Sequence, residues 1–489
     1  MIPVLTPAEM GAADARTIAA GTPERVLMER AGRAVAWRVR TVLGGTYGRR
    51  IVVIGGKGNN GTDGRIAAAT LRSWGAQVEV LELADPAGVI DGRARRAIAR
   101  AHLVVDAMFG TGFRGTIEGD AAELVGLTDG ARAAGAVVVA VDIPSGVDGL
   151  TGAVRGPAVH ADHTVTFGAP KPGLWFHPGR ARAGDVTVAD IGIDLGPDAL
   201  RSVMVEPHDV ARWIPRRNAT THKWRAGVLV IGGSNGMAGA PMLVAHAALR
   251  LGAGIVWAAL PGRAAELASG SEVITLAVPD DGAGVLSPGG VATLQAALAQ
   301  GRFGALVLGP GLGAAPETAH AVRALVATTT IPLVLDADGL TAMANEPDGL
   351  CQRRALTVLT PHDGEFARLT GAAPGEDRIA AARALAVDAN AVVLLKGPTT
   401  VVASPDGRVA LNPTGGPALA TAGSGDVLSG MIGAFCAQGM DGFEAATAGA
   451  FVHGRAADRA GHTGLVASDL PVAAAAALNE IIDCPAQEA

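Results

Sequence analysis

Short runs of Val, Ile and Leu recur along this chain, and most of them end in a glycine-rich turn that leads into an Ala-rich stretch. A strand buried in a parallel sheet has this apolar composition, and a crossover helix has to follow it before the next parallel strand begins. The repeated order therefore predicts an α/β fold with parallel sheets. The predicted strands span residues 51–54, 78–83, 103–105, 137–141 and 163–167 in the first part and 228–231, 255–259, 305–308, 333–335, 357–359 and 391–395 in the second.

A segment from about residue 195 to residue 225 separates the two parts, because its prolines and charges interrupt any sustained period. With 489 residues the chain is long enough for two or three cores of about 150 residues each. No tandem sequence repeat links the two parts. We therefore predict two doubly wound αβα domains, residues 1–206 and residues 207–489, the first of them Rossmann-like.

The charge balance argues against nucleic acid and membrane partners, since these require a concentrated field of Lys and Arg and the formal net charge is −6. The N-terminus lacks the charged and apolar regions of a secretory signal, and no window of about 18 apolar residues runs uninterrupted. The three cysteines, Cys351, Cys436 and Cys484, are widely spaced, which favours reduced thiols in the cytoplasm. We therefore expect chemistry on small molecules.

The first predicted strand runs into the sequence GGKGNNGTDG, residues 55–64, which precedes a predicted helix. Gly56, Gly58 and Gly61 fit the pattern G-x-G-x-x-G, and Glu82 lies at a suitable distance downstream for a ribose contact. Glycines at such a turn let backbone amides approach a phosphate at the helix N-terminus. This match alone would indicate a dinucleotide-dependent oxidoreductase, but the sequence offers no evident hydride-acceptor pocket or proton donor.

Acidic residues follow two later strands. Asp106 opens the segment DAMFGTGFRG, and Asp142 opens DIPSGVDG, which also contains Ser145. Because the carboxyl ends of parallel strands meet at one edge of a sheet, we expect these residues to share a pocket with Asn60 and Asp63. A lone Asp would more simply cap a helix or turn, but several at successive strand ends favour a site. Their oxygen atoms suit a hard monovalent or divalent cation.

The motifs NNGTDG, DAMFGTGFRG and DIPSGVDG, in this order, resemble the N-terminal domain of the NAD(P)H-hydrate repair proteins over about residues 1–205. The resemblance implies a potassium ion held by Asn60, Asp106 and Ser145. Thr62 stands where the usual motif has Gly. The implied substrate contacts are Asn59, Asn60, Gly61, Thr62, Asp63, Gly110, Thr111, Gly112, Phe113, Arg114, Gly115, Thr116 and Asp142.

A second set of glycine-rich and acidic segments follows the strands of the second part. The last segment, GSGD, opens an apolar helix, whose free backbone N–H groups and positive end could stabilise a transferring phosphoryl group. Asp426 beside that end could take the proton from an attacking hydroxyl. The chain lacks the P-loop pattern G-x-x-x-x-G-K-[ST]. The segments are GGSNGMAGA (232–240), GPGLG (309–313), DADGL (336–340), TPHDGE (360–365), LLKG (394–397) and GSGD (423–426).

Simpler interpretations of three of these residues stay open. The helix dipole would favour Asp426 in the first turn of a helix whatever its chemistry. His362 could be a histidine with a purely structural role. Lys396 at a strand end could simply be solvated.

The series HKW, GGSxxxxGA, GPGLG, DADGL, TPHxGE and GSGD resembles the ribokinase-like superfamily, and within it the ADP- or ATP-dependent NAD(P)H-hydrate dehydratases, over about residues 208–485. The resemblance implies a ribokinase-like second domain with Asp426 as the catalytic base. The implied contacts to the hydrated nucleotide are Ala240, Gly313, His362 and Asp426, and those to the adenylate are Lys396, Gly397, Pro398, Thr399, Thr400 and Gly425. The chain departs from the usual motifs at Trp224, Asp363, Gly416 and Ser424.

Together the two resemblances imply an enzyme that repairs hydrated NADH and NADPH. The first domain would interconvert the C6 epimers, with Asp142 as our candidate for moving protons. The second would dehydrate the S form with ADP or ATP and Mg²⁺ through a phosphorylated intermediate, and the sequence does not decide between the two nucleotides. The fold class favours a symmetric homo-oligomer. The alternative is a ribokinase-like kinase of a small molecule, joined to a non-catalytic N-terminal binding domain.

Overall fold

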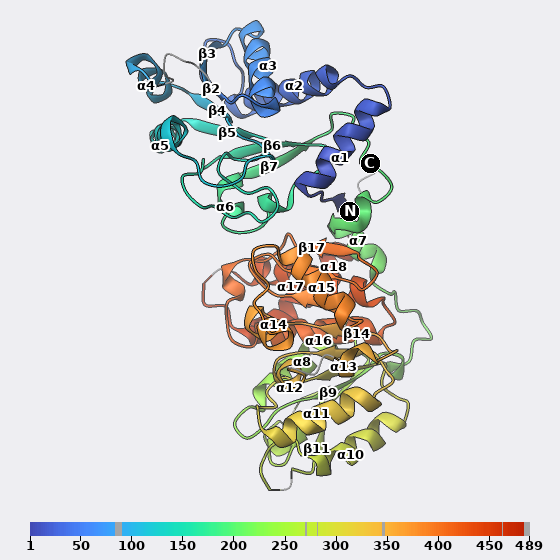
Figure 1. Cartoon of the computed structure of the whole chain (residues 1–489). Coiled ribbons are helices and arrows are strands. Elements are labelled where there is room, and N and C mark those ends of the chain that lie inside the picture. Colours follow the sequence, from blue (N-terminus) through green and yellow to red (C-terminus); the bar gives the residue numbers. More distant parts are fainter. Residues whose placement is uncertain (84–89, 269–270, 281, 345–347, 462, 484–489) are drawn as a thin grey trace. The chain divides into compact units, whose positions relative to one another are not determined.

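The computed structural model describes residues 1–83, 90–268, 271–280, 282–344, 348–461 and 463–483. It consists of two compact units, Ile2–Ser202 and Val203–Ala489, the second of which also includes Met1. Each unit contains a sheet with helices packed on it (Figure 1), which confirms the predicted α/β class with two αβα units. The units divide between residues 202 and 203, and the predicted domain boundary between residues 206 and 207 stays a prediction.

The sheet of the first unit is parallel, and its strand order reverses between β2 and β4, because β3 lies on one side of β2 and β4 on the other. Ligands of doubly wound folds bind beyond the carboxyl ends of the strands at such a reversal. The strands are, in spatial order, β3 (Gln77–Glu82), β2 (Arg50–Gly55), β4 (Leu103–Ala107), β5 (Val137–Val141), β6 (His163–Phe167) and β7 (Asp185–Ala189).

Successive residues of β2 point to opposite faces of this sheet, as the pleat of a strand requires. Ile51 and Val53 pack with α2 (Glu24–Leu43) and α3 (Asn59–Ser73) on one face. Val52 and Ile54 pack with α4 (Gly92–Ala99) and α5 (Gly119–Ala133) on the other. Helices therefore cover both faces. This unit also contains α1 (Pro7–Ala19), α6 (Arg180–Ala183) and the short 3₁₀ helices η1 (Pro172–Leu174) and η2 (Ala199–Arg201).

In the second unit a run of parallel strands ends at β15, which pairs with the antiparallel strand β16. Residues 396–400 form the turn between these two strands. The parallel strands are, in spatial order, β11 (Ile274–Val278), β10 (Ile255–Pro261), β9 (Gly227–Ile231), β12 (Ala305–Leu308), β13 (Leu333–Leu335), β14 (Thr357–Leu359) and β15 (Val392–Leu395). The antiparallel strands that follow are β16 (Val401–Ala403) and β17 (Val409–Leu411). Two further short strands are β1 (Ile2–Pro3) and β8 (Ser202–Met204).

A large apolar core covers one face of this second sheet. Val228 and Val230 of β9 pack there with α8 (Gly239–Arg250) and α16 (Ser424–Ala437). After its first turn α16 is buried along its length, as expected of a helix that is apolar on all sides. The core thereby fixes the direction of the helix that GSGD opens.

The other helices of the second unit complete its layers. Two of them, α17 (Gly442–Ala460) and α18 (Leu470–Asp483), share the core with α8 and α16. The remaining α-helices are α7 (Pro207–Trp213), α9 (Ala264–Leu267), α10 (Pro288–Ala299), α11 (Pro316–Thr328), α12 (Asp338–Ala342), α13 (Asp348–Cys351), α14 (Asp363–Thr370) and α15 (Arg378–Asp388). The 3₁₀ helices are η3 (Lys223–Ala226), η4 (Pro417–Leu419) and η5 (Ala467–Asp469).

The predicted strands all exist, but the sequence pattern does not predict the short strands β1 and β8, nor β7, β11, β16 and β17. β7 and β11 are largely half-buried or exposed, so they lack the continuous apolar run of the central strands. β16 and β17 have three residues each, which is too short for a period to show.

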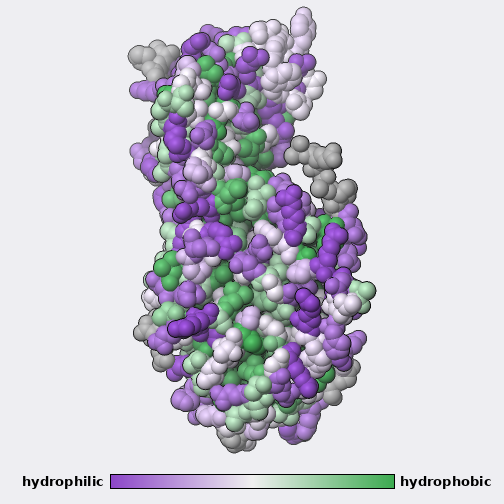
Figure 2. All heavy atoms as spheres, turned by 90° about the vertical axis from the view of Figure 1, so that its right-hand side faces the viewer, coloured by the Kyte–Doolittle hydropathy of each residue, from purple (hydrophilic) through white to green (hydrophobic). Residues whose placement is uncertain are grey.

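Hydrophilic and hydrophobic residues are interspersed on the face of the molecule in Figure 2, where no continuous apolar band crosses the coloured atoms. Within the described ranges, no helix combines the length and the apolar character needed to cross a bilayer. Cys351 is exposed and Cys436 is buried. Cys484 lies outside the described residues.

Candidate active sites

A cavity of about 960 Å³ lies at the carboxyl ends of β2, β4 and β5, next to the reversal of strand order in the first unit. Phe109 and Phe113 on its wall pack against each other, with ring centroids 4.9 Å apart, and provide an apolar surface. The predicted site residues that line the cavity are Asn59, Asn60, Asp63, Gly110, Thr111, Gly112, Phe113, Arg114 and Asp142.

The glycines of the G-x-G-x-x-G match allow close backbone packing inside the protein. A Cβ atom on Gly56 would lie 1.9 Å from the carbonyl oxygen of Met108, and one on Gly61 would lie 1.9 Å from that of Gly56. Glu82, the predicted ribose contact, forms an ion pair with Arg65 at 3.1 Å. These contacts account for Gly56, Gly61 and Glu82 without a bound dinucleotide, whereas a Cβ atom on Gly58 would meet nothing within 4 Å. Of the described residues predicted to contact substrate, those outside the cavity lining are Gly61, Thr62, Gly115 and Thr116, and their contact with substrate stays a prediction.

Asp106 and Ser145, two of the predicted cation ligands, contact each other inside the first unit. The hydroxyl of Ser145 donates to Oδ1 of Asp106 over 2.6 Å, and its backbone N–H donates to Oδ2 over 2.8 Å. Asp106 lies within β4 rather than after it and is fully buried. Burial raises the pKa of Asp106 to about 6, although hydrogen bonds from Ser145 and Met108 oppose the shift.

The third predicted cation ligand, Asn60, is the second residue of α3. A Cβ atom on Gly110 would lie 3.3 Å from its amide oxygen. Nδ2 of Asn60 is buried and finds no hydrogen-bond partner in the described part of the chain, and a buried polar atom without a partner costs free energy. The donor set of one carboxylate, one amide and one hydroxyl consists of oxygen ligands, which fits a hard cation.

The sequence analysis did not single out Lys171, which the structure places against Asp142. Nζ of Lys171 lies 2.6 Å from Oδ1 of Asp142, and Lys171 is only 1% exposed. It also donates to the hydroxyl of Thr166 and to the carbonyl oxygen of Phe167. Lys171 follows β6 much as Asp142 follows β5, so its place after a predicted strand was the available signal.

Glycine-rich loops of the second unit meet beyond the carboxyl ends of β9, β12 and β13. The hydroxyl of Ser234 donates to the carbonyl oxygen of Gly311 over 2.9 Å. A Cβ atom on Gly311 would lie 3.3 Å from the side chain of Ala240, and the N–H of Gly313 donates to Asp338 over 2.8 Å. The predicted residues Ala240 and Gly313 therefore belong to one loop cluster.

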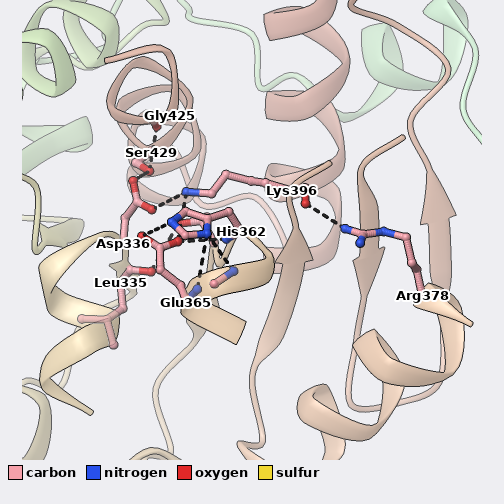
Figure 3. A network of polar contacts seen from close by, with 10 residues as sticks. Leu335, Asp336, His362, Glu365, Arg378, Lys396, Gly425 and Ser429 are labelled. Carbon is pink, nitrogen blue, oxygen red and sulfur yellow. Dashed lines mark hydrogen bonds and ion pairs between the residues drawn. The ribbon is translucent and has the colours of Figure 1, made fainter. Parts of the chain in front are cut away.

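A network of buried charges stands beside these loops (Figure 3). Nζ of Lys396 lies 2.9 Å from Asp336 and 3.6 Å from Glu365, and the hydroxyl of Ser429 donates to Asp336 over 2.6 Å. Burial alone would raise the pKa of Asp336, but the charge of Lys396 and the hydrogen bonds hold it below its ordinary value. Burial would likewise lower the pKa of Lys396, but the two carboxylates raise it. Lys396 is therefore an ion-pair partner and not a solvated lysine.

Ala337 separates the two acidic residues of the DADGL segment. Its φ is +50°, in a region that residues with a side chain rarely adopt. The turn at Ala337 lets Asp336 reach Lys396 while Asp338 accepts from Gly313.

Asp426 is the third residue of α16 and lies in its first turn. Gly423, which precedes the helix, has a positive φ. No side chain caps this helix N-terminus, so its positive end is available for an anion. Burial raises the pKa of Asp426 to about 7, the charge of Asp336 adds to the shift, and that of Lys396 opposes it. Nζ of Lys396 also lies 3.5 Å from where a Cβ atom on Gly425 would stand. A carboxyl with this pKa beside an anion-binding helix end is suited to act as a general base.

His362 has the contacts of a helix cap. Its Nδ1 accepts from the N–H groups of Gly364 and Glu365, over 2.9 and 3.3 Å, at the start of α14. About half of its side chain is exposed, so it is also accessible. The predicted nucleotide contacts that follow Lys396 form the hairpin between β15 and β16. They are Gly397, Pro398, Thr399 and Thr400.

Two family models match the chain. The model described as NAD(P)H-hydrate dehydratase matches residues 228–479. The model described as YjeF-related protein N-terminus matches residues 24–102 and 89–173. The dehydratase model covers the loops and the GSGD helix of the second unit. The other model covers the cavity loops of the first unit.

Curated relatives match nearly end to end. A protein of Moorella thermoacetica named bifunctional NAD(P)H-hydrate repair enzyme is 40% identical over 510 residues, which cover 96% of this chain and 95% of that protein. A protein of the same name from Mycobacterium leprae is 42% identical over 459 residues, covering 90% of each chain. A solved ribokinase-like superfamily protein from Enterococcus faecalis aligns with a TM-score of 0.50 and 19% identity over 57% of this chain and 96% of that chain. At that identity the structural likeness concerns the fold alone.

Proposed function

The chain belongs to the bifunctional NAD(P)H-hydrate repair enzyme family, and on that premise we propose that it returns hydrated NADH and NADPH to their reduced forms. It combines an epimerase, which is an isomerase, with a dehydratase, which is a lyase. We assign residues 1–206 to the epimerase domain and residues 207–489 to the dehydratase domain. The observation that carries the proposal is Asp426, whose pKa is near neutrality at the uncapped start of a buried helix.

The dehydratase acts on a hydroxyl group at C6 of the nicotinamide ring, and hydroxide leaves poorly at neutral pH. Asp426 removes the hydroxyl proton as the oxygen attacks the terminal phosphorus of the nucleotide, whose bridging P–O bond breaks. The uncapped N-terminus of α16 stabilises the charge on the phosphoryl oxygens. The ring nitrogen then expels phosphate from C6, and loss of a proton from C5 restores the reduced ring.

We propose ADP or ATP as the phosphoryl donor, together with Mg²⁺, which would neutralise phosphate charge. Asp336 and Glu365 are both engaged by Lys396, so we expect phosphate oxygens and water to supply most ligands of the metal. Ala240, Gly313, His362 and Asp426 would contact the hydrated nucleotide. The proposed contacts to the adenylate are Lys396, Gly397, Pro398, Thr399, Thr400 and Gly425.

Phosphoryl transfer onto a chiral carbon requires in-line geometry, so the dehydratase should accept only the S epimer. The epimerase would return the R epimer to use, with Asp142 moving protons. We propose a potassium ion at Asn60, Asp106 and Ser145, where it would supply positive charge among oxygen donors. The oxygen atoms of these three side chains support this, because a hard cation prefers oxygen ligands, and those of Asp106 and Ser145 lie together.

Purified protein incubated with both epimers and either ADP or ATP tests the proposal. We expect full recovery of the near-ultraviolet absorbance of the reduced nicotinamide, with one inorganic phosphate released for each molecule restored. The alternative kinase activity would instead consume nucleotide without absorbance recovery and leave a stable phosphate ester. That outcome would overturn the proposed function.

The variant Asp142→Asn should separate the two activities. On a mixture of epimers we expect this variant to restore the S fraction at the wild-type rate and then to stall. Without its proton-transfer group, the R fraction should convert about 10²-fold more slowly or slower still. The time course of absorbance measures both phases. Unchanged recovery of the R fraction would remove Asp142 from the mechanism.

The rate of dehydration should rise with pH through about 7. Asp426 has to be ionised to accept a proton, and its pKa is raised to about 7 by burial. We therefore expect kcat/KM for the S epimer, at saturating nucleotide, to increase from about pH 6 and to level off above about pH 8. A profile that falls over this range would contradict Asp426 as the base.

Two broader expectations accompany this function. We propose that the enzyme acts in the cytoplasm, because its three cysteines are few and widely spaced, as in proteins that keep their thiols reduced. We also expect a symmetric homo-oligomer, as is common for enzymes of this kind. Cell fractionation and light scattering test these two expectations.

A further inference from the structure

Four of the ionisable side chains that line the cavity of the first unit come from separate elements of the fold. They are Asp14 of α1, Asp63 of α3, Asp142 after β5 and Lys171 after β6. The charge of Asp142 raises the pKa of both Asp14 and Asp63. The carboxyl groups are therefore close enough to influence one another's protonation.

Asp142 is paired with a buried lysine. Lys171 and Thr166 both donate to its Oδ1, over 2.6 and 2.9 Å. Among the described residues, the hydrogen bonds to this side chain all reach Oδ1, which leaves Oδ2 available to a ligand. Its φ of +66° is an uncommon conformation that sets the side chain at the end of β5. Lys171 is buried beneath it, so the charge of the carboxylate is balanced from inside the protein.

Asp63 is in the opposite situation. It is 7% exposed, and its Oδ1 has no hydrogen-bond partner in the described part of the chain. Burial raises the pKa of Asp63 to about 8, and the charges of Asp142 and Asp14 add to the shift. Among the described residues, no ion pair joins Asp63 to a cation in the way that Lys171 is joined to Asp142. One cavity thus holds a carboxyl group that is paired with a buried lysine and a second, unpaired one whose pKa is raised, an arrangement that suits a base and an acid acting together.

We propose that Asp63 is a catalytic acid of the epimerase, paired with Asp142 as the base, and that Lys171 is the positioning residue of that base. The carboxyl of Asp63 protonates the C6 hydroxyl as the C6–O bond breaks, and the lone pair of the ring nitrogen forms a double bond to C6. A water molecule then attacks C6 from the other face and gives its proton to Asp142, while the double-bond electrons return to nitrogen. The reverse conversion uses the same two groups with exchanged roles.

This inference rests on the proposed epimerase activity and adds the identity of the second proton-transfer group. The planar cation formed at C6 and the ring nitrogen would be stabilised by the negative charge of Asp142. Asn at position 63 preserves the shape of the neutral acid but cannot give up a proton on demand. The role of Asp63 is therefore separable from its packing.

The test compares Asp63→Asn with the wild-type full chain and with Asp198→Asn, which changes an exposed carboxyl of the same unit. Conversion of the R to the S epimer is followed by chromatography without nucleotide, so that the dehydratase is idle. We expect the rate to fall about 10²-fold or more in Asp63→Asn and to be unchanged in the control. Thermal unfolding of each variant, compared with that of the wild type, reports that the first unit is folded, and dehydration of pure S epimer reports that the second unit is intact. If the wild type does not epimerise, the proposed function fails; if only the effect of Asp63→Asn is missing, this inference fails.

Isotope incorporation tests the attack of water on C6, and a charge-balanced variant tests the roles of Asp142 and Lys171. In ¹⁸O-labelled water each inversion should place a labelled oxygen on C6, and retention of the original oxygen would overturn the mechanism. Lys171→Met leaves Asp142 buried without its partner and can impair folding. The double variant Lys171→Met and Asp142→Asn removes both charges, so we expect it to recover the wild-type melting temperature without epimerase activity. Epimerase activity in the folded double variant would exclude the pair from catalysis.

Discussion

Replacing Asp426 by Asn is expected to slow dehydration of the S epimer about 10²–10⁴-fold, the usual contribution of a positioned general base. Asn keeps the size and a hydrogen-bonding group of the side chain at the start of α16 but cannot accept the proton of the C6 hydroxyl. Single-turnover kinetics with saturating nucleotide measure the chemical step directly. The affinity for ADP, measured by calorimetry, should change little, because the helix end that binds phosphate stays uncapped.

The same variant carries a stability control. Asp426 has a pKa of about 7 in the folded protein, against an ordinary value of 3.8. Between these two pH values the folded state therefore binds more protons than the unfolded state. Its contribution to stability is therefore present at low pH and is lost as the pH rises through about 7. At pH 8 we expect Asp426→Asn to melt at the same temperature as the wild type or higher. A variant that is both stable and fully active would refute the role of Asp426.

Replacing Lys396 by Met is expected to destabilise the second unit by about 3–5 kcal/mol, the usual cost of removing one partner of a buried ion pair. The side chains of Asp336 and Glu365 are only 2% and 7% exposed, and both lose their cation in this variant. Dehydration should also be lost, because Lys396 stands beside Gly425 where phosphate would bind. Urea unfolding, followed with a probe of the second unit, measures the change in free energy.

Lys223→Met is the matched control, since Lys223 is an exposed lysine of the same unit. We expect it to change the free energy of unfolding by no more than about 0.5 kcal/mol. A charge-balanced variant, Lys396→Met with Asp336→Asn, should recover part of the lost stability without activity. If Lys396→Met alone unfolds like the control, the network of Figure 3 is not a stabilising one.

The sequence predicts most of the fold, because buried parallel strands such as β9 and β12 have an apolar pattern that depends little on distant residues. It also predicts that Asp106 and Ser145 meet. Asp106 lies near the end of β4, Ser145 follows β5, and these two strands lie side by side. The antiparallel hairpin of β16 and β17 is not predictable in the same way. The three-residue strand β16 owes its conformation to pairing with β15, and β17 owes its conformation to pairing with β16, which no local pattern encodes.

The candidate sites were predictable by residue type but not by partner. Lys171 and Lys396 are two of only four lysines in the sequence, but only the fold brings them to Asp142 and Asp336. Gly56 illustrates the opposite error. A glycine in a nucleotide-binding pattern suggests a ligand, but here the neighbour that excludes a side chain is the carbonyl oxygen of Met108.

Both sites contain a residue other than glycine with a positive φ, Asp142 in the first unit and Ala337 in the second. Such a conformation costs on the order of 1–3 kcal/mol, which the surrounding fold has to offset. Glycine at position 337 would relieve the strain and also free the turn that directs two acidic side chains. The carboxylates are thus aimed before any ligand arrives, so that little of the binding energy is consumed in turning them. A substitution that relaxes the backbone at position 337 should therefore raise the melting temperature of the protein and lower its catalytic rate.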